Sequence, residues 1–178
     1  MKCPYHKTFL IIIIAVLFIR CDNSVESLEK GGCKVNVNGF ITKSYSGEAI
    51  FENVPSLQGS IFFLLLKDNN LSEEKYCFVE FSGSKPDVGT YNLINIEEDN
   101  NNKGKLAGRY NDSENYGSYK SIGGSIEIHY SSDKEIKGKF NFPAYEYVPS
   151  SNGEFQRVEI IVSGEFYAEQ GYTGIILN

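Results

Sequence analysis

The sequence predicts an all-β fold: an antiparallel β-sandwich of about nine strands, with an up-and-down or calycin-like β-barrel as the alternative. Two observations support this prediction. Short apolar or alternating runs recur along the chain with polar turn residues between them, and no long stretch has helical periodicity. The chain also contains 17 glycines, which suit turns and bulges in a sheet. Strands with one apolar face must pack in two layers or close on themselves.

The first part of the body contains both alternating and wholly apolar runs. The run from Ile61 to Leu66 is apolar throughout and is bounded by turn residues, which indicates a strand covered on both faces rather than a helix. The run from Cys33 to Ile41 instead alternates, as expected for a strand with one buried face. These patterns predict strands at 33–41, 48–53, 61–66, 76–81, 90–96 and 105–110.

The clearest predicted pair is a hairpin in the C-terminal half, where two successive runs alternate between apolar and polar residues. The two apolar faces lie on the same side of the sheet only when the numbers of paired residues sum to an even number, because a one-residue slip turns every side chain of one strand to the opposite face. The register that pairs Ile126 with Phe140 also sets Glu127 beside Lys139. The two runs are 125–130 and 135–142, with the turn at 132–134 or one residue wider at each end. The residues predicted to face the core are Ile126, Ile128, Tyr130, Ile136, Gly138, Phe140 and Phe142. The remaining predicted strands are 156–168 and a short edge strand within 171–178.

Several strand-and-glycine patterns are similar to those of a known family. The segments that carry the similarity are Gly123–Ile128, Ile136–Phe142 and Val158–Phe166, with shorter matches at Val37–Gly39 and Val88–Leu93. They resemble the "GGSITI … ISGTFSF … VTITNGSF" pattern of a family of uncharacterised Bacteroidetes-type β-sandwich lipoproteins. The resemblance implies an exported β-sandwich, and it implies neither a known activity nor a catalytic residue.

The N-terminus has the form of an export signal. Lys2 and Lys7 precede an apolar run at 9–19, and this run is shorter than the ~20 residues of a membrane-spanning helix. Cys21 follows Arg20, an arrangement that resembles the lipoprotein signal, in which a cysteine becomes the lipidated N-terminus. Arg20 stands where a small residue is usual, so an uncleaved or differently cleaved signal is the alternative.

The predicted organisation is a signal peptide at 1–20, a flexible polar tether at 21–32 and a single β domain at 33–178. Lipidation of Cys21 would anchor the protein in the bacterial cell envelope, at the outer membrane or a periplasm-facing membrane. The formal charge of the chain is −6, and loss of the leader's three basic residues would make it −9. This acidic balance argues against nucleic acid as a partner.

Two cysteines remain in the predicted β domain, Cys33 and Cys77. An exported protein permits a disulfide between them, and two free buried thiols are the alternative. A disulfide would stabilise the fold by roughly 3–4 kcal/mol on the chain-entropy model. The spacing matches neither a zinc cluster nor a redox CxxC motif, so metal and thiol redox chemistry are not expected.

Catalytic and metal-binding patterns are weak. His129 is the one histidine outside the leader, and it alternates onto the polar face beside Glu127, where a solvent-exposed side chain is expected. The acidic loop at 97–104 fails as an EF-hand, because Lys103 and Tyr110 fall at positions that require oxygen ligands. We therefore expect no catalytic residue, no metal site and no cofactor.

Aromatic residues make up 13% of the chain, and tyrosines cluster twice around segments that we expect to be polar loops. Exposed loop tyrosines suit sugar or protein partners, and packing at the rim of the core is the alternative. One cluster comprises Tyr110, Tyr116, Tyr119 and Tyr130, and the other comprises Tyr145, Tyr147, Tyr167 and Tyr172.

The leading functional hypothesis is a non-enzymatic binding or structural protein of the cell envelope, with a protein or glycan partner. The specific ligand-binding residues are not apparent from the sequence. A β-barrel carrier of a small apolar ligand is the alternative. A carboxylate-dependent hydrolase ranks third, since a chain with 23 acidic residues always contains some pair of carboxylates.

Overall fold

The computed structural model describes residues 28–56, 59–70, 75–81, 83–95, 105–115 and 117–172. These residues form ten strands and one short 3-10 helix, η1. The elements are β1 (Gly32–Gly39), β2 (Lys43–Ser56), β3 (Gly59–Asp68), β4 (Lys75–Phe81), β5 (Gly89–Asn92), β6 (Leu106–Asp112), η1 (Ser113–Asn115), β7 (Gly117–Ser121), β8 (Ser125–Ser131), β9 (Glu135–Pro149) and β10 (Phe155–Gln170). Within this described part, no helix has the length and apolar character needed to span a membrane.

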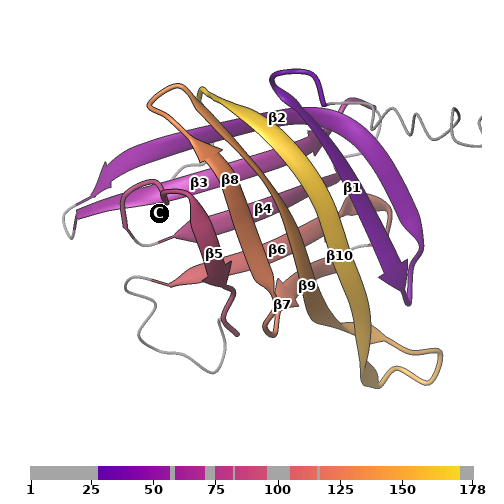
Figure 1. The fold of residues 1–178 in the computed structure, drawn as a ribbon. Helices are drawn as coiled ribbons and strands as arrows, with labels where there is room; N and C mark the ends of the chain where they lie inside the picture. Colours follow the sequence, from indigo (N-terminus) through magenta and orange to yellow (C-terminus); the bar gives the residue numbers. More distant parts are fainter. Residues whose placement is uncertain are drawn as a thin grey trace, which may run out of the picture.

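All ten strands belong to one mostly antiparallel sheet whose hydrogen bonding follows a ring. The pairing runs through β1, β2, β3, β4, β6, β7, β9 and β10 and returns to β1. The sheet is not a regular barrel, because β7 and β8 both pair with β9 and β5 adds to the far side of β8. Figure 1 shows β1, β8, β9 and β10 crossing in front of β2, β3, β4 and β6. The predicted all-β antiparallel fold is confirmed, with two facing layers as in a sandwich and pairing that continues round as in a barrel.

The β8–β9 hairpin has the predicted register over most of its length. Ile126 pairs with Phe140 and Glu127 with Lys139, and β8 ends and β9 begins on either side of the turn at 132–134. A bulge at residue 129 then shifts the register, so that Tyr130 pairs with Lys137. An extra residue in one strand reverses the side that later residues face. The prediction that Tyr130 faces the core was therefore wrong, and its side chain is 47% exposed.

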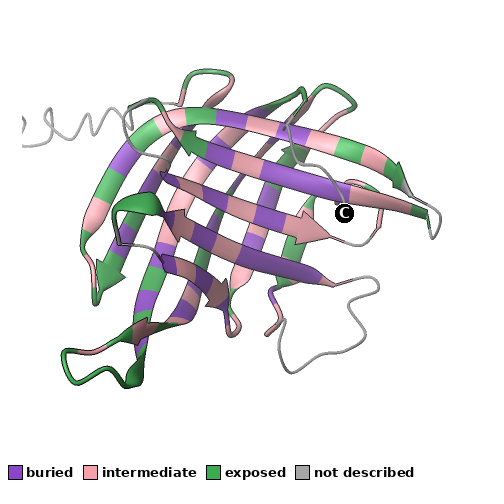
Figure 2. Cartoon of the chain, turned by 180° about the vertical axis from the view of Figure 1, so that it is seen from behind, coloured by how far each residue is buried: buried purple, intermediate pink, exposed green. Residues whose placement is uncertain are grey.

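The interior between the two layers is filled mainly by aromatic and branched aliphatic side chains, and burial alternates along the strands (Figure 2). Two glycines make room for neighbouring rings. A Cβ on Gly138 would lie 2.9 Å from Phe166 Cζ, and a Cβ on Gly164 would lie 2.7 Å from Phe140 Cζ. Each glycine is paired in register with the phenylalanine that covers it. The two rings also stack, with centroids 6.5 Å apart.

Besides shifts of strand ends, such as β5 ending at Asn92 where a strand at 90–96 was predicted, three segments differ from the sequence-based expectation. Residues 117–121 form a strand, β7, where a tyrosine-containing loop was expected. The strand β9 continues past its predicted end at 142 to Pro149, through the segment of Tyr145 and Tyr147 that was expected to be a polar loop. Ile122 donates its N–H to the Pro143 carbonyl on the side of β9 away from β10, so a proline N at this position removes no β9–β10 hydrogen bond. Of the predicted C-terminal edge strand, Gly171 and Tyr172 are not in a strand, and 173–178 lie outside the described residues.

Candidate functional site

The outer face of the sheet carries a row of alternating asparagine and serine side chains that crosses six strands. The residues are in register with one another across β5, β8, β9, β10, β1 and β2, and each is exposed or half-buried. In that order they are Asn92, Ser125, Asn141, Ser163, Asn36 and Ser44. We call them the Asn/Ser row. Neighbouring strands lie ~4.8 Å apart, so the row repeats an amide or a hydroxyl at about that spacing.

A second, mainly charged row lies beside the Asn/Ser row. Its members are Thr90, Glu127, Lys139, Glu165, Lys34 and Ser46. The Lys139 ammonium lies 2.9 Å from the Glu127 carboxylate, which confirms the predicted cross-strand contact. Lys139, with a smaller contribution from His129, lowers the pKa of Glu127 below its usual value. The carboxylate is therefore held in its charged, accepting form.

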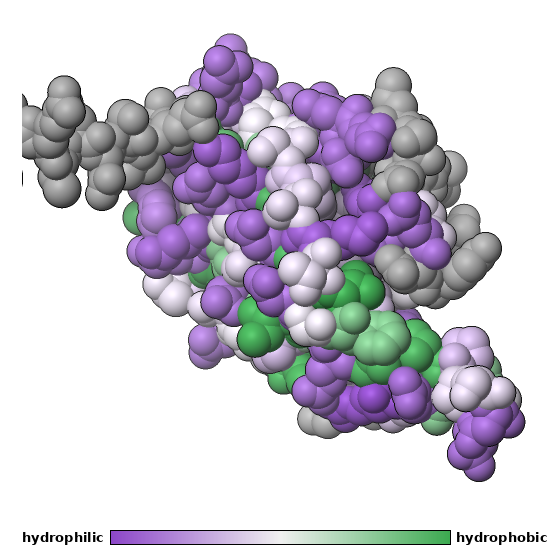
Figure 3. Space-filling view, turned by 90° about the vertical axis from the view of Figure 1, so that its right-hand side faces the viewer, coloured by the Kyte–Doolittle hydropathy of each residue, from purple (hydrophilic) through white to green (hydrophobic). Residues whose placement is uncertain are grey.

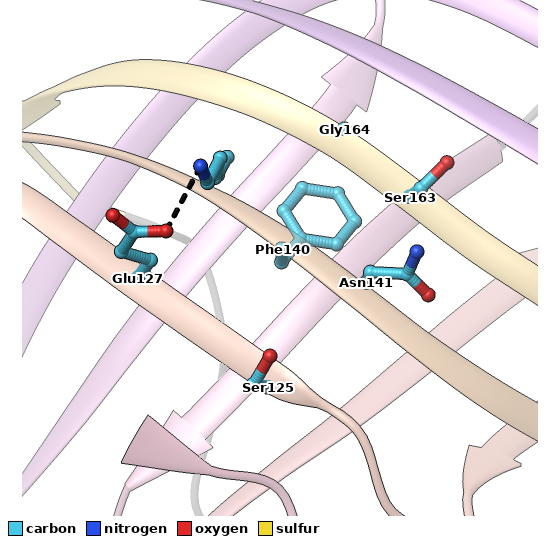
Figure 4. A pocket seen from close by; sticks show the side chains of 7 residues that line it. Ser125, Glu127, Phe140, Asn141, Ser163 and Gly164 are labelled. Carbon is cyan, nitrogen blue, oxygen red and sulfur yellow. Dashed lines mark ion pairs between the residues drawn. The ribbon is translucent and has the colours of Figure 1, made fainter. Parts of the chain in front are cut away.

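A shallow depression of about 310 Å³ lies where the two rows cross β8, β9 and β10. Ser125, Asn141 and Ser163 line it from three adjacent strands (Figure 4). The short serine side chains on either side of Asn141 leave the face hollow. Glu127 and Lys139 border one side, and Phe140 and Gly164 complete the lining. The depression therefore offers hydroxyls, an amide, a carboxylate and an ammonium to a polar ligand.

His129 lies next to this surface at the β8 bulge. Its Nε2 is 3.0 Å from Glu127 Oε1, and the imidazole is 45% exposed, as expected for a solvent-facing histidine. Among the residues that the structure describes, no three His, Cys, Asp or Glu side chains form a group that could hold a metal ion. The tested acidic loop at 97–104 lies outside the described residues, as does Cys21.

Cys33 and Cys77 are buried free thiols in the core, on β1 and β4. Cys33 donates to the Glu48 carbonyl with an Sγ–O distance of 3.4 Å. Burial raises the pKa of Cys33 to about 12. Burial, with nearby Cys33, also raises the pKa of Cys77. Both thiols are therefore poor nucleophiles in the folded protein, because the thiolate is the reactive form.

This burial predicts slow alkylation of both thiols. At about pH 8, Cys33 should have a thiolate fraction roughly a thousandfold below that of an ordinary cysteine. Iodoacetamide should label neither residue in the native protein and both in urea, as measured peptide by peptide by mass spectrometry. Labelling in urea that requires prior reduction would contradict the free thiols and indicate the alternative disulfide.

The first tyrosine cluster lies largely inside the fold. Tyr110 and Tyr119 are fully buried on β6 and β7, and their ring centroids are 6.2 Å apart. Among the residues that the structure describes, neither hydroxyl has a hydrogen-bond partner. Tyr45 beside them donates to the Leu66 carbonyl and accepts from the Cys77 N–H. Burial, followed by the charge of Asp112, raises the pKa of Tyr110. Tyr119 lies in β7 and not in the loop that was expected, and its burial agrees with the packing alternative rather than with an exposed binding site. Tyr116 lies outside the described residues.

The second cluster is divided among different environments. Tyr145 is buried on the outer side of β9 because the Arg157 guanidinium covers its ring at 4.3 Å and Tyr147 packs edge-on against it. Tyr167 donates to Glu135, a residue that also pairs with Lys30 at 2.7 Å. Lys30 falls within the predicted tether, and its ammonium lies 2.7 Å from the Glu135 carboxylate and 3.0 Å from the Glu169 carboxylate.

Comparison of this chain with protein-family models, with curated proteins and with solved structures finds no match. The resemblance to an envelope lipoprotein family stays a prediction. The Asn/Ser row was missed because its members come from strands far apart in the sequence. The sequence did indicate that each member faces outward, because each lies at a polar position of an alternating strand.

Proposed function

We propose that this chain is an exported protein, anchored at the bacterial cell envelope through a lipid on Cys21, that binds an envelope glycan on its Asn/Ser row. The observation that carries the proposal is the six-strand register of that row, with the depression of about 310 Å³ at its centre. The signal-like pattern of the N-terminal sequence supports the envelope location, and the acidic charge of −6 suits a neutral or cationic ligand better than a phosphate-rich one.

The chemistry of the row favours a polyhydroxylated ligand. Amide groups both donate and accept hydrogen bonds, and serine hydroxyls do the same, so each can bond a sugar hydroxyl in either sense. A linear glycan laid across the strands would meet a new amide or hydroxyl about every 4.8 Å. The depression at Ser125, Asn141 and Ser163 would receive one sugar ring more deeply than the rest.

The same observations rank the alternatives. A carrier needs space for an apolar ligand between the layers, and that region is occupied by aromatic side chains such as Phe51, Phe62 and Phe142. A hydrolase needs two carboxylates facing each other across a cleft. In the described part of the chain, Glu127 is engaged by Lys139 and His129, while Glu135 and Glu169 share Lys30. Both patterns favour binding over carriage or catalysis.

The test is binding of the full-length protein, in mild detergent, to a panel of soluble bacterial envelope polysaccharides and their oligosaccharides. We expect saturable binding to at least one glycan. Asn141→Ala should weaken it about tenfold, the equivalent of one hydrogen bond to a ligand. Ser163→Val should weaken it further by filling the depression.

The matched control is Asn38→Ala, which removes the same group from an exposed outward position on β1 outside the row. It should bind as the wild type does. Equal affinity for the wild type and Ser163→Val, or binding to no glycan in the panel, would refute the site. Labelling with radioactive palmitate tests the anchor separately, and an unlabelled Cys21 peptide would refute lipidation.

A further inference from the structure

The β9–β10 hairpin extends beyond the ring of strands. The pairing of β10 with β1 ends at Ile160, and the pairing of β9 with β7 ends at Tyr145. From there to the turn, the two strands pair with each other in register from Val158 with Glu146 to Phe155 with Pro149. Figure 1 shows this ribbon projecting from the lower end of the molecule, and Figure 3 shows hydrophobic side chains gathered in the lower half. A two-stranded projection has two outer edges, and both need protection from other strands.

The outer edge of β9 is protected. Tyr147 donates its N–H to the Glu146 carboxylate at 2.8 Å, and Pro149 has no N–H to offer. The second oxygen of Glu146 accepts from the Ser118 N–H at 3.2 Å, which holds the carboxylate against this edge. Proline and an edge-facing charge are two of the devices by which proteins block strand addition.

The outer edge of β10 is open. Glu159 accepts from the Phe40 N–H on this edge, and alternate residues of a strand direct their backbone groups to the same side. The N–H and C=O groups of Arg157 and Phe155 therefore also point outward, and within the described residues they have no partner. Phe155 beside them is 71% exposed. An open edge next to an exposed aromatic side chain is a surface that invites strand addition.

We propose that this β10 edge pairs with the same edge of a second copy of the chain, antiparallel about a two-fold axis at Gln156. Phe155 then exchanges backbone hydrogen bonds with the partner's Arg157, and the axis repeats the exchange for a total of about four bonds. The outward N–H and C=O groups of both residues are satisfied in both copies.

The side chains favour a second copy over an unrelated strand. Phe155 and Arg157 are two apart in a strand and so lie on one face. The guanidinium of Arg157 already packs one face on Tyr145 and pairs with Glu159 at 2.8 Å. The two-fold axis sets the partner's Phe155 ring beside this held guanidinium, where it can cover the other face in an attractive cation–π arrangement. The contact is also closed, because it uses the open edge of each copy and leaves none for a third. A pairing this short should be weak in dilute solution, and a shared membrane surface would raise the local concentration. The proposed dimer does not depend on glycan binding.

Cysteine cross-linking tests the axis directly. In the proposed pairing, Gln156 and the partner's Gln156 form a non-hydrogen-bonded pair with Cα atoms ~4.5 Å apart, within the range that a disulfide spans. The full-length Gln156→Cys protein, expressed in cells with its leader, should run mainly as a reducible dimer on non-reducing gels. Ser151→Cys, at the exposed tip of the same hairpin, is the matched control and should remain monomeric.

Second-site changes decide between edge pairing and random collision. Adding Phe155→Lys to Gln156→Cys should abolish the dimer, because lysine faces the partner's Arg157. Adding Arg157→Pro should do the same, since it removes an outward N–H while leaving the β9 pairing intact. Circular dichroism of both variants checks that they fold. A monomeric Gln156→Cys protein, an equal dimer from Ser151→Cys, or a dimer that survives both second changes in folded protein would overturn the proposal.

Discussion

Replacing Gly47 by alanine is expected to prevent stable folding. A Cβ at this position would lie 1.8 Å from the Lys67 carbonyl oxygen and 2.8 Å from the Lys67 carbonyl carbon. Both atoms belong to the backbone of β3, so no side-chain rotation can relieve the clash. Gly47 also pairs with Cys33 on its other side, which prevents β2 from moving away from β3. The glycine is required at the point where β2 passes from pairing with β1 to pairing with β3.

The expected loss of stability is more than ~3 kcal/mol, the upper end for ordinary overpacking of a core. Domains of this size are stable by about 5–15 kcal/mol, so the variant should be largely unfolded or unfold at a much lower urea concentration. Urea unfolding followed by far-ultraviolet circular dichroism measures the shift. Ser46→Ala, at the exposed neighbouring position, is the control and should change stability little. An unchanged midpoint for Gly47→Ala would contradict the close approach of β2 to the Lys67 carbonyl at this position.

Truncation of Phe166 is expected to have the second largest effect. Its ring is fully buried, covers Gly138 and stacks with Phe140. Phe166→Ala should lower the free energy of unfolding by ~3–5 kcal/mol, because the ring's contacts are lost and the cavity is not refilled. The glycine beneath cannot be enlarged to compensate, since a Cβ there would also lie 2.3 Å from the Glu127 carbonyl.

Phe155→Ala provides a matched comparison on the same strand. Its side chain is 71% exposed, so the substitution should change monomer stability by less than about 0.5 kcal/mol. Both variants should be measured by urea unfolding at low protein concentration, where association contributes little. Similar losses for the two substitutions would contradict the assignment of the inner and outer faces of β10.

Local pattern in the sequence was enough for most strands. Alternation placed the register of Ile126 with Phe140 correctly, because one buried face permits a single parity of pairing. The bulge at residue 129 could not be predicted, since the run 125–130 alternates between apolar and polar residues without interruption and so gives no sign of an extra residue. For the same reason Tyr130 was assigned to the wrong face. β7 was missed because its inward tyrosine at 119 resembles a polar loop residue when its neighbours are Gly117 and Ser118.

The candidate site could be predicted only in part. Lys139 beside Glu127 followed from one hairpin, whose strands are adjacent in the chain. The Asn/Ser row joins residues from Asn36 to Ser163, and its alignment depends on β10 pairing with both β1 and β9. Local sequence patterns do not show which distant strands become neighbours in the sheet.

Short-range sequence patterns therefore sufficed for the all-β class and for most strand positions, because each depends on residues within a few positions of one another. The signal at the N-terminus was inferred from the same kind of pattern and stays a prediction. The ring of pairing, the row across six strands and the open β10 edge required the folded structure. These features arise from hydrogen bonds between strands that are far apart in the chain. The same backbone groups could pair in many other orders, and packing of the whole core selects one of them.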